Sequence, residues 1–191
     1  MIKKLGLALL CAGILVACST DDGGSKQRAL TNAEQKAALV QRIDSLENVM
    51  QEKDLLPGDM LMGDLLKDYM MYTEKYPGES DKTPEYLYKA AAISRAINLP
   101  VKAIKLYDKI LSKYPNWEKA PEVAFLTAFT YDEDLKKPEL AKESYEDVIE
   151  KYPGDLWAVQ AEQRLATISM SDEELLEFLR QKQLEAEAAE E

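Results

Sequence analysis

Apolar residues recur along most of the chain at intervals of three and four, which places them on one face of an α-helix. The stretch from residue 31 to 56 contains a seam of this kind, made of Leu39, Ile43, Leu46 and Met50. The period-two alternation and the β-branched runs that indicate strands are missing from the sequence. The pattern therefore predicts an all-α protein.

Capping residues and prolines mark where these helices begin and end. Thr31 and Glu34 have the spacing of a capping box, and so do Ser171 and Glu174. Several other helices open with proline at their first position, where its missing N–H is harmless. The expected helices are residues 31–56, 60–74, 84–97, 100–113, 138–151 and 156–168, with one more from Pro121 and a last one after Ser171.

The string Lys-Tyr-Pro occurs three times, at residues 75–77, 113–115 and 151–153, which is an interval of 38 residues. A second tyrosine stands at a constant distance before each string, and these residues are Tyr69, Tyr107 and Tyr145. A fixed period of this size indicates one helical unit stacked side by side.

The residues around these tyrosines resemble the tetratricopeptide repeat (TPR). Its second helix reads Ala-x3-Phe, then a small or aliphatic residue three later and proline five later. Two copies match every offset and one matches more weakly: Ala103, Tyr107, Ile110, Pro115; Ala141, Tyr145, Val148, Pro153; and Leu65, Tyr69, Tyr72, Pro77. In the first helices, Leu87 and Ala91 match the large and small packing positions. Ala128 is the next small residue, in a repeat whose loop is one residue longer. The pattern's Trp and Gly are missing, and the period is 38 rather than 34.

The resemblance covers residues 60–168 and implies a TPR-like α-solenoid of about three helix pairs, residues 57–184, with an extra N-terminal helix and a C-terminal capping helix. The motif tyrosines would then fill the space between helices. Residues 31–56 would pack on the first repeat or form a short coiled coil. Residues 185–191, which are only Glu and Ala, would fray as an acidic tail.

The first 17 residues have the pattern of a secretory signal peptide. Two lysines precede residues 5–17, an uncharged apolar run that is shorter than the about 20 residues needed to span a bilayer. The run ends in Leu-Val-Ala before Cys18, which resembles the bacterial lipobox and implies lipidation of Cys18. The alternative is an ordinary signal peptide cut near Ala17. Residues 18–30 are then expected to be a flexible tether.

The residues after Cys18 bear on the location of the protein. By resemblance to bacterial sorting rules, Ser19 implies anchoring in the outer membrane. Asp21 and Asp22 loosely resemble an acidic signal that directs some lipoproteins to the cell surface, although a solvated linker would look the same. The period of 38 is also similar to that of TPR proteins of bacterial envelopes, among them the lipoprotein of the outer-membrane β-barrel assembly machinery and the coordinator of the Tol-Pal system.

Composition argues against several kinds of chemistry. The chain has no histidine, and its two cysteines, Cys11 and Cys18, lie in or next to the leader. His-based triads, His or Cys zinc sites and thiolate nucleophiles are therefore not expected. A net charge of -11 argues against nucleic acid as a partner. Residues 132–134, Asp-Glu-Asp, lack the glycine of a calcium loop and predict a solvated turn. We expect no enzyme activity, no cofactor and no metal.

In TPR proteins the first helices of successive pairs line a concave groove that holds a peptide or helix. The resemblance places the candidate groove at Glu85, Tyr88, Ala92, Arg95, Glu122, Phe125, Phe129 and Asp132. Phe125 and Phe129 share a helix face and would either anchor an apolar partner or pack on the next helix. Trp117 and Trp157 would cap the core or contact a partner.

The expected function is a lipid-anchored, non-catalytic scaffold that binds proteins of the bacterial envelope. The alternative is a surface lipoprotein that binds a glycan or peptide during uptake.

Overall fold

The structure, a computed structural model, describes residues 29–52, 59–168 and 170–189, and the elements named below all lie within them. Every regular element in these ranges is helical, which confirms the all-α prediction. The elements are α1 Asn32–Glu52, α2 Met60–Lys75, α3 Lys82–Ala96, α4 Pro100–Lys113, α5 Ala120–Phe129, a π-helical turn Thr130–Asp134, α6 Pro138–Lys151, α7 Leu156–Thr167 and α8 Asp172–Ala189.

The capping residues form the hydrogen bonds expected of them. Thr31 N–H donates to the carboxylate of Glu34 at 2.7 Å, and Glu34 N–H donates to the Thr31 hydroxyl at 3.2 Å. Asp59 accepts from Leu61 N–H at 3.0 Å, and Asp155 accepts from Trp157 N–H at 2.8 Å. These bonds satisfy N–H groups that have no partner within the helix, which is why the predicted starts agree with the observed ones.

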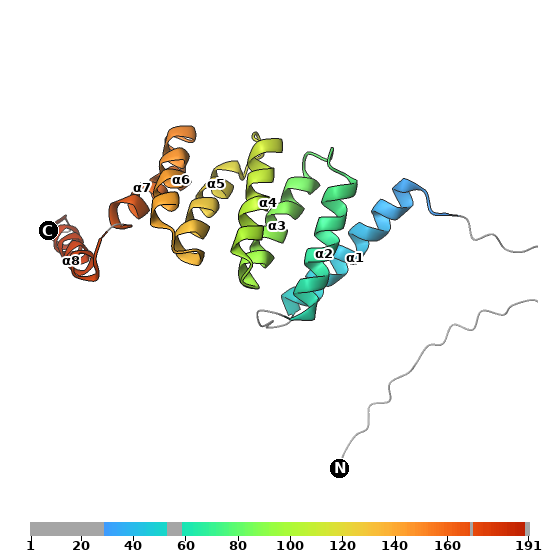
Figure 1. The fold of residues 1–191 in the computed structure, drawn as a ribbon, viewed down its shortest axis with the longest axis horizontal. Helices are drawn as coiled ribbons and strands as arrows, with labels where there is room; N and C mark the ends of the chain where they lie inside the picture. The colour runs from blue at the N-terminus through green and yellow to red at the C-terminus, as the bar shows by residue number, and fades with distance from the viewer. Residues whose placement is uncertain (1–28, 53–58, 169, 190–191) are drawn as a thin grey trace, which may run out of the picture.

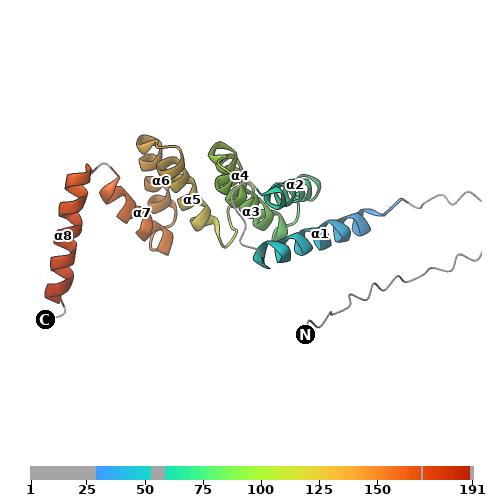
Figure 2. The ribbon, with the colours of Figure 1, turned by 90° about the horizontal axis from the view of Figure 1, so that it is seen from below.

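The helices form two layers (Figures 1 and 2). The second helices of the pairs, α2, α4 and α6, make one layer, and α1, α3, α5 and α7 make the other. In Figure 2 the second layer lies on the inner side of a shallow arch. This arrangement is an α-solenoid, in which each pair mainly contacts its neighbours.

The repeated tyrosines form the core. Tyr69 and Tyr107 are each 1% exposed and Tyr145 is fully buried, which confirms their expected packing role. Alanines occupy the small positions of the motif: Ala91, Ala103, Ala128 and Ala141, all fully buried. A methyl side chain at these places lets two helix backbones approach closely, and the tyrosine one turn later fills the space beside them.

The Tyr-Pro loops also join consecutive units. The hydroxyl of Tyr114 donates to the carbonyl oxygen of Pro77 at 2.6 Å, which links one loop to the loop of the preceding unit. Each tyrosine of the string ends its helix, because the following proline disfavours the helical conformation at the residue before it.

Helix α1 packs on the solenoid, which decides between the two alternatives for residues 31–56. Ile43 is fully buried among the residues of α2 and α3, and Leu39, Leu46 and Met50 pack around it. Lys36, at the polar end of the seam, pairs with Glu79 at 2.5 Å. Helix α1 thus acts as the first helix of a pair with α2. The last predicted residues of this segment, 53–56, lie outside the described part of the chain.

Helix α8 departs from its expected role as a cap. It leads away from α7 (Figures 1 and 2) and leaves Leu176, Leu179 and Leu184 more than half exposed. The helix continues to Ala189, into the residues that we expected to fray. Alanine and glutamate are both strong helix formers, so a run made only of these two residues extends the helix.

Candidate partner-binding face

The side chains that the TPR resemblance assigned to the groove lie on the α1, α3, α5 and α7 layer. We call the face formed by Glu85, Tyr88, Ala92, Arg95, Glu122, Phe129 and Asp132 the partner face. Its polar groups connect neighbouring helices. The Tyr88 hydroxyl donates to Glu122 at 2.6 Å, and Lys119 pairs with Glu85 at 2.9 Å. Both contacts join α3 to the start of the next pair, so these side chains also set the spacing of the repeats.

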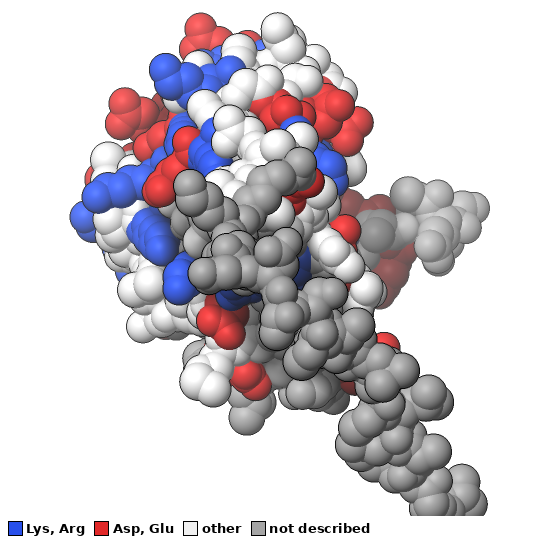
Figure 3. Space-filling view, turned by 90° about the vertical axis from the view of Figure 1, so that its right-hand side faces the viewer, with Lys and Arg blue, Asp and Glu red and all other residues white. Residues whose placement is uncertain are grey.

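A cleft of about 770 Å³ opens at the N-terminal part of this face. Its walls come from α1, from the start of α3 and from the two loops that contain Ser80 and Asn116. Trp117 and Tyr86 line it together with side chains of both charges, including Lys82 and Asp44. Lys and Arg are likewise interspersed with Asp and Glu on the end of the solenoid that Figure 3 shows. The volume lies within the range of ligand clefts, roughly 300–1,000 Å³.

Ala92 is exposed on α3 beside a smaller hollow of about 200 Å³. Tyr88 and Met50 line the same hollow, which connects α3 to the second half of α1. Ala92 is therefore a position where a side chain can be added without entering the core.

Two arginines enclose Phe129 in the middle of the face. The guanidinium carbon of Arg95, from α3, lies 5.0 Å from the ring centroid, and that of Arg164, from α7, lies 5.2 Å from it. Guanidinium groups at this distance are attracted by the ring's negative face. Phe129 is half-buried, and the three residues connect three successive helices of the layer.

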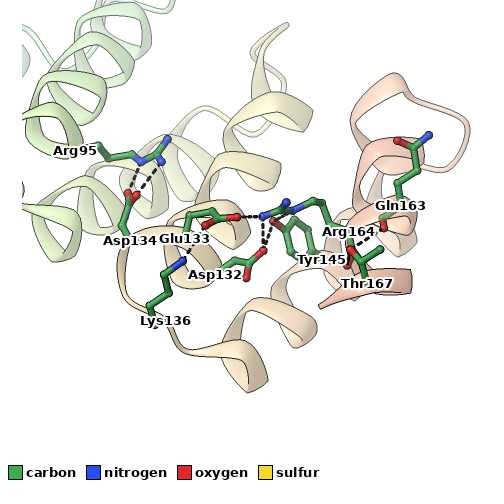
Figure 4. A network of polar contacts seen from close by, with 9 residues as sticks. All are labelled: Arg95, Asp132, Glu133, Asp134, Lys136, Tyr145, Gln163, Arg164 and Thr167. Carbon is green, nitrogen blue, oxygen red and sulfur yellow. Dashed lines mark hydrogen bonds and ion pairs between the residues drawn. The ribbon is translucent and has the colours of Figure 1, made fainter. Parts of the chain in front are cut away.

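The acidic residues 132–134 bind these arginines, so the predicted solvated turn is wrong (Figure 4). Asp134 accepts two hydrogen bonds from Arg95, at 2.5 and 3.1 Å. Asp132 accepts from Arg164 at 2.7 Å, and Glu133 also pairs with Arg164. The hydrogen bond from Lys136, reinforced by Arg164, lowers the pKa of Glu133 below its ordinary value of 4.5.

The π-helical turn explains how these carboxylates reach their partners. The interval from Ala128 to Ala141 is one residue longer than that from Ala91 to Ala103. Thr130–Asp134 absorbs the extra residue in a wider turn, and Lys136 adopts a positive φ of 51° where the chain leaves it. Single π-helical turns of this kind are often found at functional sites.

Phe125 is placed in the core and not on the open face. Its side chain is 6% exposed, and its ring lies 5.1 Å from that of Trp157 and 5.5 Å from that of Tyr145. The sequence left two interpretations of the Phe125–Phe129 pair, an anchor for a partner or packing on the next helix. Phe125 packs on the next helix. Trp117 and Trp157 are both half-buried and pack against core residues.

Sequence reasoning did not find three residues that hold this face together. Arg164 of α7 pairs with the acidic turn, Lys119 pairs with Glu85, and Glu47 of α1 accepts from both Tyr69 and Lys89. Their partners are 22 to 42 residues away, so no local spacing reveals them. The signal that the sequence offers for Arg164 is that it is the single basic residue of the expected helix 156–168.

The arginine pairs predict an effect of pH on stability. A carboxylate whose pKa is lowered in the folded state stabilises above its ordinary pKa and loses that stabilisation as the pH falls through the lowered value. Arg164→Met is therefore expected to lower the free energy of unfolding by about 1–2 kcal/mol at pH 7. The difference in the free energy of unfolding between the variant and the wild type should be smaller at pH 3 than at pH 7, as measured by urea unfolding. Arg180→Met is the matched control, because the Arg180–Glu177 pair is exposed on α8. A gap that does not change with pH would contradict this account of the turn.

Comparison with known proteins agrees with this architecture. The family model of the tetratricopeptide repeat matches residues 85–116 and 122–155, which correspond to the α3–α4 and α5–α6 pairs. Both matched segments are therefore similar to tetratricopeptide repeats, and the fold of the described residues is that of a TPR-like α-solenoid. Repeats of this type generally bind protein partners and are typically non-catalytic. No curated protein matches the chain.

Across residues 29–52, 59–168 and 170–189, no group of three or more His, Cys, Asp or Glu side chains is placed to hold a metal ion. Within the same ranges, no helix has both the length and the apolar character needed to cross a membrane. Cys18 and the predicted signal peptide, residues 1–17, lie outside them.

Proposed function

We propose that the protein is a non-catalytic scaffold that holds a segment of another protein on the partner face. The observation that carries this proposal is the cleft of about 770 Å³ on the inner layer, lined by aromatic side chains of α3 and of the loop between α4 and α5. The repeat match supports it, because stacked TPR units offer an extended surface that a peptide or helix can follow.

The electrostatics of the face favour a polar partner segment with a few apolar contacts. Most charged groups of the face are already paired across helices, as Glu85 is with Lys119. A partner would therefore meet a fixed pattern of both charges rather than a field of one sign. Such a pattern favours a partner whose own charges match these positions, and it gives little general attraction to a chain of one charge sign.

We further propose that lipid on Cys18 anchors the scaffold to the outer membrane. The support is the lipobox-like sequence before Cys18 and the polar residues that follow it. A flexible tether of about twelve residues has a root-mean-square span of roughly 20 Å. That length keeps the solenoid close to the membrane but clear of it, which suits a role in outer-membrane protein assembly or envelope maintenance.

The proposal is tested by site-specific photocrosslinking in intact cells. A photoreactive amino acid at Ala92 is expected to give a discrete protein adduct, because this exposed position lies on the partner face. The same amino acid at Ala37, an exposed position on α1 away from the cleft, is the control. Equal adducts from both positions, or none from Ala92, would overturn the scaffold function.

A Cys18→Ser version of the same chain tests the anchor. Labelling with a palmitate analogue and membrane fractionation should show that the wild-type protein carries lipid and sediments with outer membranes. The Cys18→Ser protein should lose both properties. Membrane association and labelling that survive the substitution would show that Cys18 is not the anchor.

A glycan or peptide ligand for uptake is the second candidate. The observation in its favour is that Trp117, Tyr86 and Asn116 line the same cleft, and aromatic rings with nearby amides suit a sugar. Native mass spectrometry of the protein purified from envelopes separates the two. A bound small molecule without a protein adduct at Ala92 would favour this candidate.

A further inference from the structure

The two complete repeats differ at one packing position on the side facing the α2, α4 and α6 layer. The large residue of the first repeat, Leu87, is fully buried. Its counterpart in the second repeat, four residues before the small residue Ala128, is Ala124. An alanine there leaves the space of a leucine side chain unfilled, unless the neighbouring helices move closer together.

The helices do not close this space. A hollow of about 580 Å³ lies between α4 and α6, with Ala124, Thr127 and Tyr131 as its floor. The corresponding floor residues of the first repeat, Leu87, Ala90 and Ser94, are fully buried. The groove between α2 and α4 is lined by residues of those two helices alone. The open floor is therefore particular to the second repeat.

The walls of this α4–α6 hollow combine aromatic and acidic groups with one basic residue, Lys151. Tyr131 and Tyr152 line it, and both are half-buried. Asp108 lines it from α4 and has no ion-pair partner among the described residues, while Asp147, on α6, is paired only with the exposed Lys151 at 3.2 Å. Partial burial raises the pKa of Asp108, as expected for a carboxylate whose charge has no partner.

We propose that the α4–α6 hollow is a second interaction site, on the layer opposite the partner face, and that it takes an arginine side chain from a basic segment of a protein partner. The aliphatic stem would lie over Ala124, and the guanidinium would reach Asp108 and stack on a tyrosine ring. Guanidinium fits this site better than ammonium because it is planar and stacks on aromatic faces. The protein's own Arg95 and Arg164 lie against Phe129 in this manner.

The test uses the mature chain and a small probe, N-acetyl-arginine amide, followed by NMR. Saturable shifts are expected at the backbone amides of Asp108, Thr127 and Tyr131. Two probes control the chemistry: the citrulline derivative, which is neutral and nearly the same shape, and the lysine derivative. The citrulline derivative should bind about three- to tenfold more weakly, since it lacks the charge that pairs with Asp108.

Variants then locate the binding. Ala124→Leu introduces the residue found at this position in the first repeat and should abolish the shifts. If leucine lowers the melting temperature, Ala124→Val fills the hollow with a smaller side chain and should have the same effect. Asp108→Asn should weaken arginine binding about three- to tenfold and leave citrulline binding unchanged. Glu146→Gln makes a similar charge change at an exposed position of α6 outside the hollow and should have no effect.

Each other result overturns the proposal. Shifts that persist in both filled variants would place the probe elsewhere on the acidic surface. Equal affinity for the arginine and citrulline derivatives would show an apolar hollow that does not select a cation. The absence of saturable shifts in the wild-type chain would show that arginine does not bind. None of these results bears on crosslinking at Ala92, so the proposed function is tested separately.

Discussion

Tyr145→Ala is expected to lower the free energy of unfolding by about 3–5 kcal/mol, the cost of emptying a large aromatic site in a packed core. Tyr145 is fully buried, and its ring lies 5.5 Å from that of Phe125. Its burial raises the pKa of the phenol to about 12. Tyr107→Ala, at the same position of the preceding repeat, should cost a similar amount because Tyr107 is 1% exposed. Urea unfolding followed by circular dichroism measures both.

Tyr145→Phe separates the ring from its hydroxyl. The hydroxyl donates to Asp132 at 3.3 Å and accepts from Arg164 at 3.4 Å, both of which are long bonds. Removing it should cost only about 0.5–1.5 kcal/mol. If Tyr145→Ala cost less than about 1 kcal/mol, the repeated tyrosine would not be a core position.

Ile43→Ala is expected to release α1 from the solenoid. Ile43 is the fully buried side chain through which α1 reaches the core, and truncation of a buried isoleucine costs about 2–5 kcal/mol. Because α1 is the first described helix, the loss should appear as local opening rather than as global unfolding. Hydrogen exchange should show strongly reduced protection in α1 and unchanged protection in α4 and α6.

Gln41→Ala serves as the control, since Gln41 is exposed on the same helix. It should leave exchange in α1 unchanged. Equal loss of protection in all helices of the Ile43→Ala protein would mean that α1 belongs to the cooperative core and is not a separately docked element.

Much of the fold could be predicted because its determinants are local. Helix starts depend on a capping side chain two or three residues away, as at Asp59, and helix ends depend on the next residue, as at Tyr76 before Pro77. The repeated tyrosine could be placed in the core because its spacing from Ala103 or Ala141 fixes one helix face.

The candidate site was less predictable because its contacts join distant residues. The acidic turn is bound by Arg95 and Arg164, one from the preceding repeat and one from α7, and neither partner is visible from local spacing. The burial of Phe125 depends on Trp157 of α7, whose ring lies 5.1 Å from that of Phe125. Helix α8 was expected to cap the solenoid but leads away from it. Its strong helix propensity extends the helix without providing a surface on which it can pack.

The docking of α1 has a mechanical consequence. A force applied through the residues before Asn32 acts on the solenoid through α1. This helix has one fully buried side chain in the core, Ile43. Under load this helix would peel away before the repeats separate. Its 21 residues, once unwound, extend the chain by up to about 40 Å beyond the length of the helix. Helix α1 would then serve as an extensible spacer between the preceding residues and the partner face, so that the load does not distort that face.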